Sequence, residues 1–98
     1  MKSMKKRDKE IKEIDFFPVT PKKGLICFVS FIYQDLKISD CAILTRPNGE
    51  MRLSFPIKTL KNGKTIQTVY PITKELGIFI STTIIKAYLK FIEDKVKN

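Results

Sequence analysis

The sequence predicts a small α+β protein, in which an antiparallel β-sheet of about five strands precedes one long C-terminal helix. Between Ile11 and Tyr70, short apolar runs alternate with turn residues, which is typical of strands joined by short connections. From about Thr73 onwards the apolar residues instead recur at helical spacing. The chain has 98 residues, which is enough for a single domain. We therefore expect a basic flexible arm at residues 1–10 and one α+β domain at residues 11–98.

The first two strands are expected at Ile11–Val19 and Leu25–Tyr33. Pro18 should end the first strand and suits an edge position, because proline has no N–H to donate. Residues 20–24 contain a proline and a glycine and are predicted to form a turn. Both faces of the second strand are apolar, which predicts a central strand covered on both sides. One helix covers only one face of a small sheet, so something else must cover the other.

The remaining strands are separated by two turn signals. The turn residues are Arg46-Pro47-Asn48-Gly49 and the Asn62-Gly63 pair, and the second is a strong hairpin signal. A polar break at residues 39–40 predicts a bend or bulge in the third strand. We expect these strands at Leu36–Thr45, Glu50–Phe55 and Thr65–Tyr70.

The C-terminal segment, from about Thr73 to Val96, is predicted to be a helix with an unusually wide apolar surface. At about 100° per residue, the apolar residues form two adjacent stripes. The first stripe contains Leu76, Ile80, Ile84, Ala87, Tyr88 and Phe91, and the second contains Ile78, Ile85, Leu89, Ile92 and Val96. Such an arc exceeds the stripe of about 100° on an ordinary surface helix, so the helix needs two packing partners. We expect its own sheet and a second subunit, and hence a homodimer.

The charge balance favours an anionic partner. The chain has 19 Lys and Arg residues against 10 Asp and Glu, a formal net charge of +9. Such an excess attracts polyanions, of which nucleic acid is the commonest and an anionic membrane surface the second. A lysine-rich surface that serves only solubility is the alternative, because charge alone specifies no site.

The composition also argues against several classes of function. Histidine is absent, which removes the usual general base and the commonest zinc ligand, so we expect neither an enzyme nor a metal or cofactor site. Cys27 and Cys41 lie in apolar runs and are not in a C-x-x-C pair, which predicts buried free thiols in a reducing cytoplasm. No apolar run is long enough to span a bilayer, and we expect no signal peptide and no membrane partner.

The candidate nucleic-acid contacts are exposed cations around two predicted hairpins. They are Arg46, Arg52, Lys58, Lys61 and Lys64, supported by Lys5, Lys6 and Arg7 of the N-terminal arm. If the two hairpins lie side by side, the five hairpin cations form one surface for phosphate contacts. The alternative is a set of unconnected solvated lysines at loop tips. A competing site on the helix would use Lys86, Lys90 and Lys97, where Glu93 and Asp94 dilute the field.

Several segments, in matching order and spacing, resemble the SpoVG family (stage V sporulation protein G). They are Phe55-Pro56-Ile57-Lys58, Asn62-Gly63-Lys64, Tyr70-Pro71-Ile72, the strand Asp40 to Leu44, and the helical run containing Ile80, Ile84, Ile85 and Tyr88. The resemblance implies a small α+β homodimer that binds DNA and RNA and regulates gene expression in sporulation and septation, without enzymatic activity.

The chain departs from the family pattern at two places. Gly77 stands where the family typically has an arginine, and Ile66-Gln67-Thr68 replaces charged residues before the second proline. Contacts with nucleic acid at those positions are therefore in doubt, and Lys61, Lys64 and the arm would have to compensate. A protein-interaction module without nucleic-acid binding is the main alternative function. An exposed apolar groove would favour it, whereas a basic patch on one face would favour nucleic acid.

Overall fold

The computed structural model describes residues 10–97, with the side chain of Lys97 excepted, and confirms the α+β fold class. The described chain forms a four-stranded antiparallel sheet, a separate two-stranded sheet and one long C-terminal helix. The predicted N-terminal arm lies almost entirely outside the described residues.

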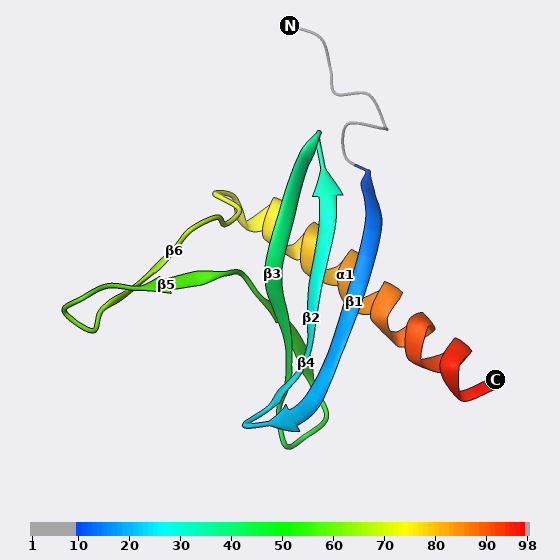
Figure 1. The fold of residues 1–98 in the computed structure, drawn as a ribbon. Coiled ribbons are helices and arrows are strands. Elements are labelled where there is room, and N and C mark those ends of the chain that lie inside the picture. Colours follow the sequence, from blue (N-terminus) through cyan, green and yellow to red (C-terminus); the bar gives the residue numbers. More distant parts are fainter. Residues whose placement is uncertain (1–9, 98) are drawn as a thin grey trace, which may run out of the picture.

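The larger sheet, here the main sheet, follows the order of the chain. Its strands are β1 (Ile11–Lys22), β2 (Leu25–Tyr33), β3 (Leu36–Thr45) and β4 (Met51–Ser54), and each pairs antiparallel with the next. Short turns join all four, so neighbours in sequence are neighbours in space. Consequently the β1–β2 and β3–β4 turns lie at one end of the sheet, and the β2–β3 turn lies at the other (Figure 1).

Two places in the main sheet bear directly on the sequence predictions, Pro18 in β1 and the polar break in β3. Strand β1 does not end at Pro18, which pairs with Cys27, but continues to Lys22. Because β1 is an edge strand, a residue without an N–H is tolerated there. In β3 the predicted bulge is confirmed, since Asp40 has a φ of 64° and the β2–β3 register shifts at this point.

The strand expected at Thr65–Tyr70 belongs to a second sheet. It is shorter, as β6 (Thr65–Gln67), and pairs with β5 (Ile57–Thr59) to form a two-stranded ribbon. Pro56 follows the end of β4 and has no N–H for a ladder bond, which explains why the chain leaves the main sheet there. Its carbonyl instead accepts a hydrogen bond from the Thr68 amide (3.1 Å), which closes the base of the ribbon. The ribbon extends away from the main sheet (Figure 1).

Helix α1 (Lys74–Lys97) packs across one face of the main sheet and encloses the core with it. It begins after Thr73, whose hydroxyl oxygen accepts a hydrogen bond from the Leu76 amide at 3.2 Å, as N-cap residues do. The predicted first stripe provides the buried side chains Ile80, Ile84 and Tyr88. On the sheet side the core contains Cys27, Val29, Phe31, Ile38, Cys41, Ile43 and Phe55.

An aromatic cluster packs the C-terminal half of the helix against the edge strand of the sheet. The Phe16 ring of β1 lies 5.5 Å from Tyr88 and 5.0 Å from Phe91, measured between ring centroids. Edge-to-face and tilted pairs of this kind add to the stabilisation from apolar burial. The face of β1 that carries Phe16 is therefore the face that packs against the helix.

The opposite face of the main sheet is uncovered by any described part of this chain. Phe17 follows Phe16 and so points to this other face, where it pairs with Phe28 of β2. Their exposed fractions are 55% and 37%. Helix α1 lies behind the sheet in Figure 1 and leaves this face open. The sequence predicts that both faces of β2 are covered, and α1 covers one of them. Residues 10–97 provide no cover for the other face.

Both cysteines are buried free thiols, as predicted. Neither Cys27 nor Cys41 has any exposed surface. Burial raises the pKa of both thiols, and that of Cys41 rises from 9.0 to about 12 with a further contribution from the neighbouring Asp40 carboxylate. Below pH 9 both thiols are protonated, and the folded state has its full stability. As the pH rises from 9 towards 12, the unfolded chain loses these protons more readily than the folded one, and the free energy of unfolding declines.

We expect both thiols to resist alkylation in the folded protein. At pH 9, iodoacetamide should modify native protein at least about tenfold more slowly than protein unfolded in concentrated urea, because the thiolate is the reactive form. Mass spectrometry of timed samples measures both rates. Equal rates for native and unfolded protein would contradict the burial of these side chains.

Candidate nucleic-acid interface

The five hairpin cations do not form one surface but divide between two hairpins that lie apart. Arg46 and Arg52 belong to the β3–β4 hairpin of the main sheet, whereas Lys58, Lys61 and Lys64 belong to the ribbon. The two hairpins extend in different directions from the body of the protein (Figure 1). The condition that they lie side by side is therefore not met.

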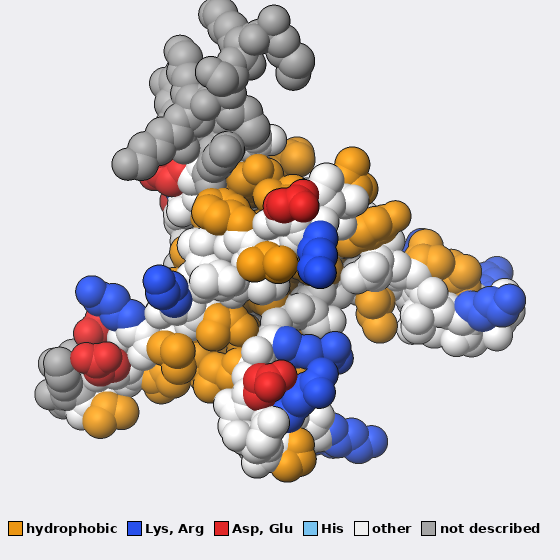
Figure 2. Space-filling model, turned by 180° about the vertical axis from the view of Figure 1, so that it is seen from behind, with side chains coloured by type: hydrophobic (Ala, Val, Ile, Leu, Met, Phe, Trp, Pro, Cys, Tyr) orange, Lys and Arg blue, Asp and Glu red, His pale blue; other side chains and the backbone are white. Residues whose placement is uncertain are grey.

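The ribbon presents the first group, here the ribbon cluster, which consists of Lys58, Lys61 and Lys64. All three lysines are exposed. The turn is held by a 2.7 Å hydrogen bond from the Leu60 amide to the Lys64 carbonyl, and the Asn62 side chain accepts another from the Lys64 amide at 3.0 Å. Residues 57–67 contain no acid. Figure 2 accordingly shows blue side chains at the tip of the ribbon without red ones beside them.

The end of the main sheet presents the second group, the sheet-end cluster, which includes two lysines that the sequence analysis missed. The Thr45 amide donates a 2.8 Å hydrogen bond to the Gly24 carbonyl, so the β1–β2 turn lies directly beside the β3–β4 hairpin. This contact brings Lys22 and Lys23 to the same end of the sheet as the two arginines. The sheet-end cluster therefore consists of Lys22, Lys23, Arg46 and Arg52, all of them exposed. Alternate turns of a meander share an end of the sheet, and that rule could have found the two lysines.

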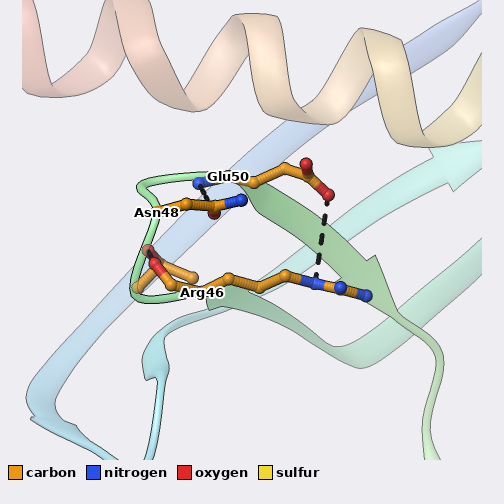
Figure 3. Close-up of polar contacts among 4 residues, drawn as sticks. Arg46, Asn48 and Glu50 are labelled. Carbon is orange, nitrogen blue, oxygen red and sulfur yellow. Dashed lines mark hydrogen bonds and ion pairs between the residues drawn. The ribbon is translucent and has the colours of Figure 1, made fainter.

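One acid lies within the sheet-end cluster. The Glu50 carboxylate oxygen is 3.9 Å from Nε of Arg46, and its own amide donates a 2.9 Å hydrogen bond to the Asn48 side chain (Figure 3). Both side chains of the ion pair are more than half exposed, and such pairs contribute little to stability. Arg46 is thus partly neutralised by Glu50, which leaves Arg52 and the two lysines as the less neutralised cations of this cluster.

The other predicted contacts have less support. Lys5, Lys6 and Arg7 lie outside the described residues, as does the side chain of Lys97. On the helix, Lys86 and Lys90 are exposed, but Glu93 and Asp94 follow within one turn. The Lys95 ammonium lies 4.9 Å from the centroid of the Phe91 ring, a cation–π distance. The C-terminal turns of α1 therefore present mixed charge rather than a basic stripe.

Two further kinds of feature were sought in the part of the chain that the structure describes, membrane-spanning helices and groups of metal-binding side chains. No helix there has the length and apolar character needed to cross a membrane. Among the same residues, no group of three or more Cys, Asp and Glu side chains could hold a metal ion.

No protein-family model matches this chain, and no curated protein matches it significantly. The resemblance to the SpoVG family accordingly depends on the sequence segments named above.

The contact between Gly24 and Thr45 should be essential for the geometry of the sheet-end cluster. A Cβ atom on Gly24 would lie 2.9 Å from the Thr45 carbonyl oxygen, whereas one on Gly49 would meet nothing within 4 Å, although both glycines have a φ near +87°. The variant Gly49→Ala should lower the free energy of unfolding by about 1–2 kcal/mol, the cost of a left-handed alanine. Gly24→Ala should cost clearly more, because the two hairpins must also separate. Equal losses in urea unfolding would show that the contact does not constrain this end of the sheet.

Proposed function

We propose that this protein is a nucleic-acid-binding regulator of gene expression of the SpoVG type, which acts as a homodimer in the cytoplasm. The proposal depends mainly on two groups of exposed cations at hairpin tips, the ribbon cluster and the sheet-end cluster. Among the described residues of these tips, Glu50 is the one acid, and it lies within the sheet-end cluster. Together the two clusters account for 7 of the 19 Lys and Arg residues of the chain. Phosphate contacts supply most of the affinity in non-specific binding, and exposed cations on hairpins are suited to them.

The ribbon has a shape suited to a nucleic-acid groove. A two-stranded β-ribbon fits the major groove of a duplex, and the lysines of the ribbon cluster would reach the phosphates on either side. Its backbone conformation is fixed by the turn hydrogen bonds at Leu60 and Lys64. Little further ordering of the backbone would then be needed on binding, which favours affinity.

A second copy of the chain is proposed to cover the open face of the main sheet. Phe17 and Phe28 are exposed there although they belong to the two strands that also supply the core. Large aromatic side chains in water are unfavourable, and their burial in a two-fold interface would stabilise a dimer. The same symmetry would present each basic cluster twice and so strengthen binding to an extended polyanion.

The resemblance to the SpoVG family supports the same proposal. The two departures from the family pattern, at Gly77 and at Ile66-Gln67-Thr68, leave the cations of the ribbon cluster in place. Buried free thiols agree with a reducing compartment, and on this we base the proposed location in the cytoplasm.

A protein-interaction module is the second candidate, and the open apolar face of the main sheet favours it. In that case another protein, rather than a second copy, would cover Phe17 and Phe28, and the basic clusters would serve solubility. The two experiments below separate these functions, since one measures nucleic-acid binding and the other measures self-association.

We expect the chain to bind oligonucleotides with an affinity that falls about tenfold or more between low and moderate salt. Changing Lys58, Lys61 and Lys64 together to alanine should weaken binding to all sequences alike and flatten the dependence on salt, because phosphate contacts are lost. A control changes Lys90 and Lys95 of the helix, which lie away from both basic clusters and from the open face of the main sheet, and should have a smaller effect. Fluorescence anisotropy across a salt series measures each affinity. Absence of binding at low ionic strength would overturn the proposal.

Light scattering at micromolar concentration should give the mass of a dimer. The variant Phe28→Glu should shift the protein to the monomer, because a carboxylate would have to be buried in the interface without a partner. Ile57→Glu, at a ribbon position that is 60% exposed and lies on neither candidate dimer face, should leave the dimer unchanged. A monodisperse monomer of the unmodified chain would overturn the dimer. Dissociation by Leu89→Glu but not by Phe28→Glu would instead move the interface to the helix.

A further inference from the structure

A groove runs along the boundary between strand β4 and the first half of helix α1. One recess, of about 340 Å³, has an apolar floor that includes Met51 and Leu53 of β4 and Ile85 of α1. A second recess, of about 550 Å³, lies nearer the start of the helix and is lined by Pro71, Gly77 and their neighbours. Ser81 and Thr82 line both recesses, which therefore adjoin, and the two together are called the groove.

The walls of the groove have one sign of charge. Arg52 and Lys86 line the smaller recess, and Lys74 lines the larger one. The described residues that line the groove include no Asp or Glu. Three cations around a recess without an opposing acid attract an anionic ligand, and the apolar walls between them strengthen that attraction.

Hydroxyl groups lie between these cations. The Thr83 hydroxyl donates a 2.7 Å hydrogen bond to the Phe79 carbonyl on the same helix. Within the described part of the chain, Ser81 and Thr82 show no such bond, so their hydroxyls can donate to a ligand in the groove. Hydroxyl donors and cations together are the side chains that most often contact phosphate and sugar oxygens.

Gly77 keeps the larger recess open. A Cβ atom at this position would already lie 3.4 Å from Cγ of Pro71, so a longer side chain would occupy the space between the helix and the base of the ribbon. The glycine that departs from the family pattern thus leaves space in the larger recess that a longer side chain would fill.

We propose that this groove binds the sugar–phosphate backbone of a single-stranded nucleic acid. The phosphates would pair with Arg52, Lys86 and Lys74, while sugars and bases would lie on the apolar floor, as on other single-strand binding surfaces. A duplex keeps its bases paired inside the helix and could not lay them on this floor. Arg52 belongs to both the groove and the sheet-end cluster, so a strand in the groove would continue onto that cluster. The inference depends on the proposed function and assigns it a second site, away from the ribbon.

The test compares single-stranded and duplex oligonucleotides of one mixed sequence. In the double variant Lys74→Gln/Lys86→Gln, which leaves both hairpin clusters intact, the affinity for the single strand should fall about tenfold or more, because two phosphate contacts are lost. The affinity for the duplex should change less than threefold, by the same reasoning. The control variant Lys90→Gln/Lys95→Gln removes the same charge from the same helix outside the groove, and should change neither affinity by more than threefold. All four side chains are exposed, and circular dichroism confirms that each variant is folded.

The outcomes separate this inference from the proposed function. If the groove variant binds the single strand normally while the ribbon-cluster variant does not, the groove is not a binding site but the proposed function stands. If the unmodified protein binds neither oligonucleotide, both fail. If polyglutamate binds the unmodified protein through Lys74 and Lys86 and the single strand does not, the groove is a site for acidic peptides and the inference is wrong.

Discussion

The packing of α1 across one face of the main sheet is the constraint on which the rest of the structure depends. Ile80, Ile84 and Tyr88 are buried against β2 and β3 through apolar contact, and the Phe16 ring extends this contact to the outer strand. One helix covers one face only. The same packing that forms the core therefore leaves Phe17 and Phe28 exposed on the other face, and a second copy is the cover that we propose.

The positions of the cations follow from how the chain enters and leaves this two-layer core. The meander places two turns at one end of the main sheet and so assembles the sheet-end cluster. Pro56 then takes the chain out of the sheet, and the ribbon returns it to the start of the helix. The ribbon cluster is consequently separated from the sheet-end cluster, and the groove that lies along β4 and α1 adds a third basic region. A ligand that contacts all three has to be extended, which agrees with a nucleic acid better than with a compact anion.

Much of the fold follows from local patterns, and the sequence predicts those parts well. The strands at Leu25–Tyr33 and Leu36–Thr45 have the expected bounds, because the hydrophobic runs and the short turn between them leave no alternative register. The bulge at Asp40 was predicted from a polar break inside the third strand, and the start of the helix near Thr73 from the onset of helical spacing. Pro18 was misjudged as a strand end, since the effect of a proline depends on which side of the strand is hydrogen-bonded. The separation of the ribbon from the main sheet, and with it the division of the cations, depends on the path after Pro56. The groove depends on packing between β4 and α1, which no local pattern reveals.

The central claim is that the basic hairpins and the groove, rather than the open apolar face, contact nucleic acid. Titrating isotope-labelled protein with a single-stranded oligonucleotide and following the backbone amide signals by NMR tests it most directly. The account predicts that signals shift in residues 22–24, 46–52 and 58–64 and at positions 74, 77, 81, 82 and 86 of the helix, while those around Phe17 and Phe28 stay in place. Shifts confined to the open face of the sheet, or no shifts at low salt, would contradict it.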